Sequence, residues 1–325
     1  MKIAIVRLSA IGDIIQSMVV LQFIKKHYPY SSIDWFVDSR FDDLLTGCDE
    51  LDQIIKLDIQ EIKLRKSIYS LFKVIKKIRS LEKYDVVIDL QGLLKSAIIT
   101  RLIPSKERIG FDRNSIREKP ASNFYSIKYH FPYSENVIRR YLGLVSSYLK
   151  FAVDDEEIMN KKSFFNLPAT KLKNLHNIVI VLGASFNSKI YPVERYAEII
   201  ENFNADYSVL WYSENELKIA KKLQSKCNRI KIVNCQTFSD LKKLINNSSL
   251  VIGGDTGPTH LAWALNKPSI TIFGSTPMNR NCFITEKNLA LSPGNKINPF
   301  KIDKNDQSIS QVEPAEIINL IKRLL

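Results

Sequence analysis

Short apolar runs alternate with stretches of helical periodicity along nearly the whole chain. A run of three to five aliphatic and β-branched residues is the pattern of a buried strand, and the amphipathic stretches between the runs are long enough for crossover helices. The expected strands are residues 3–6, 33–37, 86–88, 178–181, 208–211, 230–233, 250–252 and 269–273. The expected helices are 13–27, 42–45, 93–102 and 135–149, and others that begin at Val193, Glu214, Ser239, Thr259 and Glu313. This alternation predicts an α/β fold with parallel sheets that helices cover on both faces.

The alternation is interrupted twice. Residues 108–128 are polar, contain a proline and show no period that assigns them to an element. Residues 154–168 mix a charge run with Asn, Lys and Pro, and we interpret them as a linker. The chain is therefore predicted to form two Rossmann-like, doubly wound domains, residues 1–165 and 166–325. Ligands bind outside the carboxyl ends of strands in such sheets, so we expect the post-strand loops of both domains to face a cleft.

Composition fits a packed globular protein, with 45% hydrophobic residues in a chain of 325. Arg7 and Asp13 interrupt the first apolar stretch, so we expect no signal peptide, and no run reaches the length of a membrane span. The four cysteines are scattered without C-x-x-C spacing, which favours a reducing cytoplasm over disulfides or a zinc site.

A net charge of +13 implies an anionic partner, and many of the cations crowd residues 63–83. Read as a helix, this segment carries an apolar stripe at Leu64, Ile68, Leu71, Ile75 and Ile78. It is either a solvated basic face or a surface for an anionic membrane. Tyr69, Phe72 and Tyr84 interleave with the cations as in nucleic-acid-binding proteins, but Phe72 borders the stripe and is expected in the core. No recognition motif is present, so we expect no nucleic-acid partner.

Residues 253–260, G-G-D-T-G-P-T-H, follow an apolar run and open a predicted helix. A tight glycine turn at a helix N-terminus would present unpaired N–H groups and a partial positive charge to a phosphate. Asp255, Thr256 and His260 would stand at the rim of this anion site. The alternative is structural: Asp255 or Thr256 caps the helix and His260 packs one turn later.

Two further loops follow predicted strands. Asp13, in S-A-I-G-D, is either a helix cap or a general base that accepts a proton from a hydroxyl. Lys189, in residues 183–189, is either a solvated cation or a partner for a departing diphosphate. Glu214 and Glu216 open a helix after another strand, where a carboxylate could accept hydrogen bonds from a ribose diol or simply favour the helix dipole.

Several reaction classes lack their motifs. There is no H-E-x-x-H, D-x-D or Cys/His cluster, so no metal is expected, and there is no G-x-S-x-G, G-K-[ST] or G-x-G-x-x-G loop. Hydrolase, P-loop and dehydrogenase interpretations therefore lose their main support.

Five segments resemble, in the family's order, the lipopolysaccharide heptosyltransferases of glycosyltransferase family 9. They are K-I-A-I-V-R-L-S-A-I-G-D at 2–13, D-W-F-V-D at 34–38, V-I-D-L-Q-G-L-L-K-S-A at 87–97, R-E-K-P-A-S-N-F-Y at 117–125 and G-D-T-G-P-T-H-L at 254–261. The D-W and R-E-K-P-A-S segments look most like those of heptosyltransferase I. The resemblance implies a GT-B fold and a metal-independent, inverting transfer of heptose from ADP-heptose to the inner Kdo of Kdo2-lipid A. It also implies a cytoplasmic enzyme that works peripherally on the anionic inner face of the inner membrane.

The resemblance assigns roles by position. Asp13 would be the catalytic base, Lys189 would contact the diphosphate, and Glu216 would bind the ribose, with Glu214 left open. The loop that carries Lys189 is a residue shorter than the family pattern and holds Phe186 among polar positions, which leaves the contacts of Ser185 and Ser188 open. The remaining donor residues would be Asp255, Thr256, Gly257 and His260, and the acceptor residues Ser9, Gly12, Lys63, Arg65, Lys66 and Arg117. A transferase that adds the second heptose is the alternative within the family, and a basic nucleic-acid-binding protein is the alternative outside it.

Overall fold

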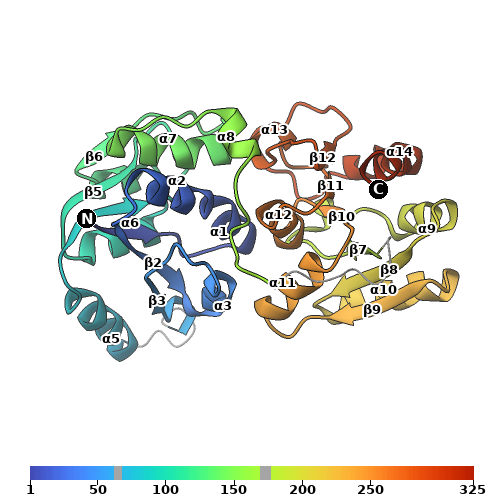
Figure 1. Cartoon of the computed structure of the whole chain (residues 1–325), viewed down its shortest axis with the longest axis horizontal. Coiled ribbons are helices and arrows are strands. Elements are labelled where there is room, and N and C mark those ends of the chain that lie inside the picture. Colours follow the sequence, from blue (N-terminus) through green and yellow to red (C-terminus); the bar gives the residue numbers. More distant parts are fainter. Residues whose placement is uncertain (62–67, 169–176) are drawn as a thin grey trace. The chain divides into compact units, whose positions relative to one another are not determined.

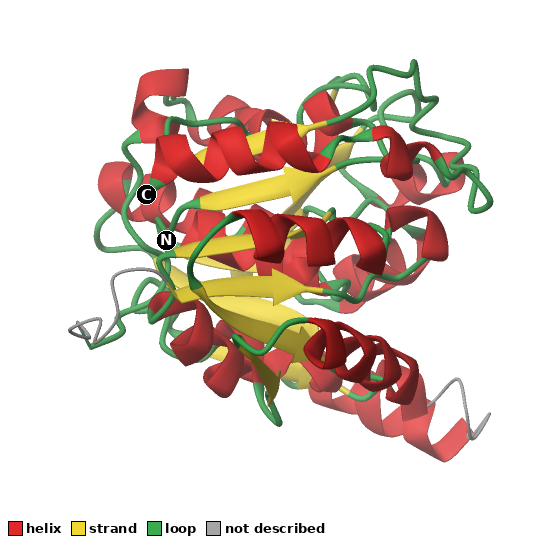
Figure 2. Cartoon of the chain, turned by 90° about the vertical axis from the view of Figure 1, so that its right-hand side faces the viewer, coloured by secondary structure: helices red, strands yellow, loops and turns green. Residues whose placement is uncertain are grey.

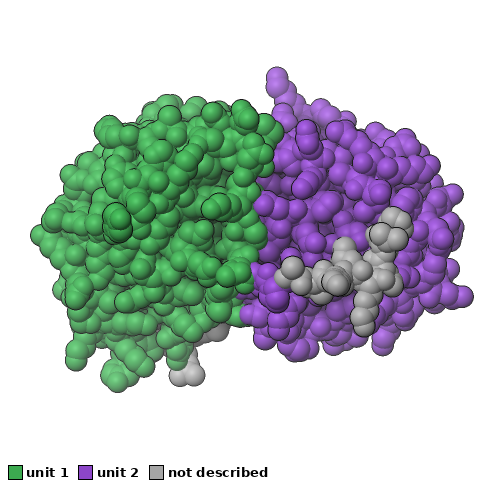
Figure 3. Space-filling model, in the orientation of Figure 1, with its two compact units in different colours: residues 1–166 green, residues 167–325 purple. Residues whose placement is uncertain are grey.

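The computed structural model describes residues 1–61, 68–168 and 177–325, and the chain divides into two compact units. Unit 1 is Met1–Asn166 and unit 2 is Leu167–Leu325, as coloured in Figure 3. Each unit holds one six-stranded sheet in which every recorded strand pair is parallel. The predicted α/β class with parallel sheets is therefore correct.

In unit 1 the sheet has the order β3-β2-β1-β4-β5-β6. Figure 1 labels β2, β3, β5 and β6 of this sheet. Its strands are β1 Lys2–Val6, β2 Ser32–Asp38, β3 Gln53–Leu57, β4 Tyr84–Asp89, β5 Ser105–Phe111 and β6 Ile127–Tyr129. Its helices are α1 Ile11–Ser17, α2 Val19–His27, α3 Asp42–Leu45, α5 Ile68–Arg79, α6 Leu94–Leu102, α7 Val137–Leu149 and α8 Asp155–Met159, with short 3-10 turns η1 Ser39–Phe41 and η2 Lys119–Phe124. The chain leaves β1 toward β2 and later returns to β4 on its other side, so the order reverses between β1 and β4.

In unit 2 the order β12-β11-β10-β7-β8-β9 reverses in the same way between β7 and β10. Its strands are β7 Asn177–Val181, β8 Asp206–Trp211, β9 Ile230–Asn234, β10 Leu250–Gly254, β11 Ser269–Ile272 and β12 Asn288–Leu291. Its helices are α9 Val193–Asn202, α10 Glu214–Lys226, α11 Phe238–Asn246, α12 Gly257–Ala264, α13 Met278–Asn281 and α14 Pro314–Leu324, with 3-10 turns η3 Asn187–Lys189 and η4 Ser308–Gln311. Figure 2 shows helices on both faces of these strands. In such sheets the crevice at the reversal is where ligands bind.

The segment 154–168, which we interpreted as a linker, does contain the boundary between the units, after Asn166, but its first part forms helix α8 of unit 1. Asp154 caps α8, because its side chain accepts a hydrogen bond from Glu157 N at 2.8 Å. Phe164 and Phe165 are buried, and the chain belongs to unit 1 as far as Asn166. A capping box and two buried aromatics show no period in so short a segment, which is why the sequence pattern missed them.

The basic helix α5 is present, but its buried face differs from the predicted stripe. Val74 and Ile78 are buried in the core cluster of unit 1, together with residues of β1, β2 and β4. Leu71 is 43% exposed, and Phe72, which we expected in the core, is 66% exposed. The helix therefore packs through Val74 and Ile78 and turns Phe72 toward solvent.

Candidate active site

The G-G-D-T-G-P-T-H segment lies at the reversal of strand order in unit 2. Gly253 and Gly254 are the last residues of β10 and do not form the predicted turn. A Cβ on Gly254 would lie 2.2 Å from the carbonyl oxygen of Lys189. Gly254 is thus required because the loop that carries Lys189 approaches the strand closely.

Asp255 is the centre of a buried polar cluster just after β10. Its Oδ2 accepts hydrogen bonds from Lys189 Nζ at 2.8 Å, Thr276 Oγ1 at 2.8 Å and Asn281 Nδ2 at 3.1 Å. Its Oδ1 lies 2.9 Å from His260 Nε2. Four side chains from three separate segments therefore converge on one carboxylate.

The charges around Asp255 decide its protonation. Burial alone would raise the pKa of this carboxyl, but Lys189 and His260 outweigh burial and hold the pKa well below its usual range. Asp255 is consequently an anion at every physiological pH. It orients Lys189 and His260 and cannot donate a proton.

Helix α12 begins directly after this aspartate. Thr256 occupies the N-cap position with an extended backbone, and Gly257 is the first helical residue. Thr259 Oγ1 donates to Thr256 O at 2.7 Å and accepts from Thr256 N at 3.3 Å, which closes the first turn. The N–H groups of a first turn have no intrahelical acceptor, so this end of α12 retains the partial positive charge that an anion site needs. Both sequence interpretations of the segment, helix cap and anion site, are compatible with this geometry.

The residues of the loop from Gly183 to Lys189 differ in burial and in the groups they contact. The Lys189 side chain is largely buried and forms the ion pair with Asp255, so it is not the solvated loop lysine of the structural alternative. Ser188 is buried, and its Oγ lies 2.8 Å from Ser275 Oγ, which makes it a contact between two loops of unit 2. Ser185 is exposed in the same loop. The departure at Phe186 brings a further cation to this loop, because Lys304 Nζ lies 4.6 Å from the centroid of the Phe186 ring.

Glu216 and Glu214 differ in exposure and in their hydrogen bonds. Glu214 is exposed, whereas the carboxylate of Glu216 accepts hydrogen bonds from Tyr212 N at 2.8 Å and Ser213 Oγ at 3.0 Å. A Cβ on Gly183 would lie 2.4 Å from this carboxylate. Glu216 therefore sits against the carboxyl end of β7, at the reversal of strand order, and is the better placed of the two for a ribose.

In unit 1 Asp13 lies in the first turn of α1, next to the carboxyl end of β1. Arg7 Nη2 lies 2.8 Å from Asp13 Oδ1, and Ala10 N donates to Asp13 Oδ2 at 3.3 Å. Arg7 is buried and also donates to Leu90 O at 2.8 Å, whereas the Asp13 side chain is 46% exposed. One face of the carboxylate is thus fixed by a buried guanidinium while the rest reaches solvent, which suits a base that must meet an incoming hydroxyl.

Several residues that the resemblance assigns to the acceptor lie around the same loop. Ser9 Oγ accepts a hydrogen bond from Lys95 Nζ at 2.8 Å, and Gly12 lies in α1 beside Asp13. Burial lowers the pKa of the Lys95 amine, which lies at the start of α6. Glu118 accepts from Leu94 N at 2.7 Å, so the loop of the exposed Arg117 lies next to that helix start. Lys63, Arg65 and Lys66 lie outside the described residues.

Sequence reasoning missed four residues of these clusters. Thr276 and Asn281 follow β11, and that position after a strand was the only available signal for them. Arg7 was noted only as an interruption of an apolar run, and Lys95 only as part of a matched segment. Side-chain convergence across separate strands has no signature along the chain, so spacing could not reveal these partners.

Other features of the described residues do not join these clusters. A pocket of about 570 Å³ in unit 1 is lined by Phe23, Lys26, Glu157 and Lys161 among others, near the C-terminal end of α2 and away from the carboxyl ends of the strands. The four cysteines are free. Within residues 1–61, 68–168 and 177–325, no group of three His, Cys, Asp or Glu could hold a metal, and no helix is long and apolar enough to cross a bilayer.

The comparisons with known proteins agree with one another. The family model described as glycosyltransferase family 9 (heptosyltransferase) matches residues 71–307. A Campylobacter coli protein named lipopolysaccharide heptosyltransferase 1 is 40% identical, with all of this chain and 99% of that protein covered.

Solved structures of the same family share the fold. E. coli heptosyltransferase WaaC with ADP-2-deoxy-2-fluoro heptose gives a TM-score of 0.80 at 21% identity, with 100% of both chains covered. E. coli ADP-heptose lps heptosyltransferase II gives 0.73 at 17% identity, with 100% of this chain and 98% of that chain covered. The two-sheet arrangement is thus that of GT-B heptosyltransferases, as the sequence predicted.

Proposed function

Because the chain belongs to glycosyltransferase family 9, the heptosyltransferases, we propose that it transfers L-glycero-D-manno-heptose from ADP-heptose to the inner Kdo of Kdo2-lipid A. The observation that carries this proposal is the 40% identity, over the whole chain, to the Campylobacter coli protein named lipopolysaccharide heptosyltransferase 1. The chain would therefore be a lipopolysaccharide heptosyltransferase I of inner-core biosynthesis in a Gram-negative bacterium.

In the domain division that we propose, a C-terminal domain of residues 166–325, which is unit 2 with one further residue, would hold ADP-heptose as a co-substrate. Glu216 would accept hydrogen bonds from the ribose hydroxyls, and the first turn of α12, with Thr256 and Gly257, would receive the diphosphate. Lys189 and His260 are held in place by Asp255, so the ammonium group of Lys189 and the imidazole ring of His260 would be presented to the phosphates and heptose. Ser185 and Ser188 would line the same loop, with Ser188 acting through its contact to Ser275.

The N-terminal domain of the same division, residues 1–165, would hold the acceptor near Ser9, Gly12 and Arg117, with Lys63, Arg65 and Lys66 as further cations. Asp13 would accept the proton from the Kdo hydroxyl as its oxygen bonds to the anomeric carbon. The bond between that carbon and the diphosphate oxygen would break, ADP would leave with the electron pair, and attack from the opposite face would invert the anomeric configuration. Lys189 and α12 would stabilise the charge on the departing diphosphate.

The proposal also covers the need for a metal ion and the location of the enzyme in the cell. The charge on the leaving group would be met by Lys189 and the helix N-terminus, so that no metal ion would be needed; transfer that stops in EDTA and returns with Mg²⁺ would contradict this part. The enzyme would work from the cytoplasm, peripherally on the inner face of the inner membrane, because Kdo2-lipid A is a lipid.

A mass-shift assay tests the reaction directly. Purified protein with ADP-heptose should add one heptose to Kdo2-lipid A, and Asp13→Ala should lower turnover by about 10² to 10⁴-fold. Near-normal turnover of Asp13→Ala would remove Asp13 as the base. Activity only on an acceptor that already carries the first heptose would identify the second-heptose enzyme instead.

A further inference from the structure

Helix α5 presents two opposite faces. Val74 and Ile78 anchor one face in the core of unit 1. On the other face lie Tyr69, Phe72, Lys73, Lys76 and Arg79, which follow the three- and four-residue steps of a single helical stripe.

The aromatic members of this stripe are unusually exposed. Tyr69 is 80% exposed and Phe72 is 66% exposed. Two exposed aromatic rings one turn apart are not explained by packing, because the helix is already anchored through its other face.

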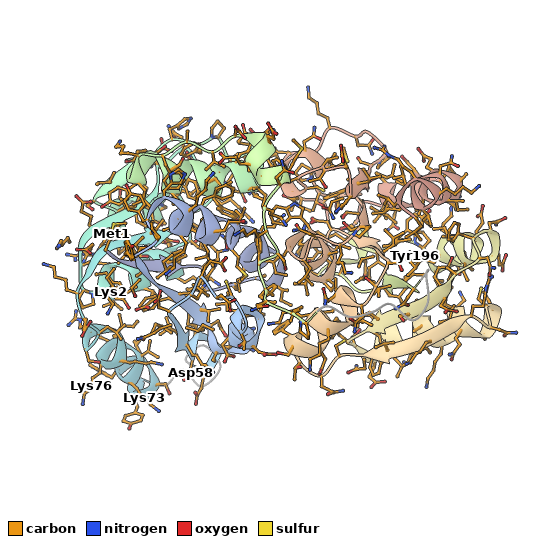
Figure 4. The ribbon with its side chains drawn as sticks, in the orientation of Figure 1. Met1, Lys2, Asp58, Lys73, Lys76 and Tyr196 are labelled. Carbon is orange, nitrogen blue, oxygen red and sulfur yellow. The ribbon has the colours of Figure 1, made fainter. Side chains whose placement is uncertain are left out.

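The cations of the stripe are exposed as well. Lys73, Lys76 and Arg79 are all solvent-exposed, and the helix Ile68–Arg79 contains no acidic residue. Figure 4 shows Lys73 and Lys76 on the outer side of α5. The outer face of α5 therefore combines aromatic rings with positive charge that no acidic residue of the helix balances.

We propose that this face of α5 is a membrane-docking surface that inserts Tyr69 and Phe72 into the interface of an anionic bilayer while Lys73, Lys76 and Arg79 meet lipid phosphates. An amphipathic helix with aromatic residues among lysines and arginines lies in the plane of such an interface. Charge complementarity selects an anionic bilayer as the partner, since each cation near its surface contributes to binding. The identification of the surface as a bilayer rests on the proposed function, in which the acceptor is a lipid.

Vesicle sedimentation tests the docking surface without donor or acceptor. Full-length protein should bind vesicles of equal parts phosphatidylglycerol and phosphatidylcholine and should bind phosphatidylcholine vesicles much more weakly. Phe72→Ser should lower the partition coefficient by roughly tenfold, and Lys73→Gln and Lys76→Gln by about fivefold each. Raising the salt concentration should reduce the lysine effect and leave most of the Phe72 effect.

Matched variants separate the helix face from general surface properties. Tyr30 is 97% exposed between α2 and β2, so Tyr30→Ser removes an exposed aromatic elsewhere in unit 1. Lys218 and Lys221 are exposed on α10 with the same three-residue spacing as Lys73 and Lys76, so Lys218→Gln with Lys221→Gln removes the same charge from unit 2. Neither control should change vesicle binding.

Insertion itself has a direct readout. In a Phe72→Trp variant, lipids brominated near the headgroup end of their chains should quench the emission of the new tryptophan. Unchanged binding of Phe72→Ser, or absence of such quenching, would overturn insertion. A protein that binds a single-stranded oligonucleotide but not vesicles, and whose Phe72→Ser variant no longer binds the oligonucleotide, would also overturn the proposal. It would show that the same rings stack on bases instead.

Transfer assays distinguish failure of the docking surface from failure of the proposed function. Transfer of heptose to a deacylated, water-soluble form of the acceptor should be unchanged in Phe72→Ser, because the ring lies on the outer face of α5. If wild type fails to transfer heptose to either acceptor, the proposed function is wrong whatever the vesicles show. If transfer is normal but the wild type does not bind anionic vesicles, only the docking surface is wrong.

Discussion

Lys189 Nζ lies 2.8 Å from Asp255 Oδ2 and 3.2 Å from the backbone oxygen of the same residue. The lysine that would neutralise a diphosphate thus donates hydrogen bonds to both the side chain and the backbone oxygen of Asp255 in the absence of a ligand. The pair is largely buried, so water screens it little. This arrangement fixes the position of the ammonium group in advance, which is the form of electrostatic assistance that is strongest in enzymes.

Asp255→Asn should be strongly destabilising at neutral pH. The substitution leaves Lys189 buried without its counter-ion, and breaking a buried pair in this way costs about 3–5 kcal/mol. Urea unfolding measures the loss. Thr276→Val, which removes only one neutral hydrogen bond to the same carboxylate, should cost about 1 kcal/mol and serves as the control.

The same pair predicts a pH dependence. The pKa of Asp255 is well below its usual range in the folded chain and about 3.9 in an unfolded one. Folded protein therefore holds this group ionised where unfolded protein takes up a proton, and the stabilisation is complete above pH 5 and decreases as the pH falls. The difference in unfolding free energy between wild type and Asp255→Asn should accordingly shrink from pH 5 to pH 3. A constant difference would contradict the low pKa.

Arg7→Lys should lower turnover without preventing folding. A lysine can retain the charge next to Asp13 but cannot hold both Asp13 and the Leu90 carbonyl with one planar group. We expect kcat to fall about tenfold and the KM for ADP-heptose to change little. Combined with Asp13→Ala, the substitution should have almost no further effect, because Arg7 acts through Asp13. Additive losses in the double variant would show that Arg7 has a separate role.

Gly183→Ala should weaken donor binding selectively. The added Cβ would lie 2.4 Å from the Glu216 carboxylate and would displace it. The KM for ADP-heptose should rise about tenfold while the KM for the acceptor stays the same, and Glu216→Ala should do likewise. Glu214→Ala is the matched control, since Glu214 is exposed in the same turn of α10. A larger effect of Glu214→Ala would assign the ribose to that residue.

Because Lys161 is buried, we expect the free energy of unfolding to rise with pH above neutrality. Burial lowers the pKa of Lys161 to about 7, whereas an unfolded lysine titrates near 10.4. Between these values the unfolded chain binds the additional proton, so the free energy of unfolding increases with pH by up to about 1.4 kcal/mol per pH unit. Lys161→Met should lose this increase between pH 7 and pH 9 in thermal or urea unfolding. Lys162→Met, at the exposed neighbour, should retain it.

The alternation of apolar runs and amphipathic stretches determined most of this protein. Strands such as β1, β7 and β10 are continuous apolar segments because both faces of a parallel sheet are covered, and that pattern is visible along the chain. The strands β3, β5, β6 and β12 were not recognised, because edge and near-edge strands are partly exposed and carry polar residues. The same pattern placed the loops of Asp13, Lys189 and Asp255 after strands, since a strand end can be inferred from where an apolar run stops.

Only the tertiary structure decided which side chains meet. The partners of Asp255 come from η3, from α12 and from the segment after β11, and the partner of Asp13 is a buried arginine that the pattern showed only as an interruption. The direction of Phe72 was predicted wrongly, because a ring at the border of an apolar stripe points inward or outward according to how the whole helix rotates on its sheet. Local patterns depend on residues near one another in the sequence, whereas these contacts join segments that the sheet topology brings together across dozens of residues.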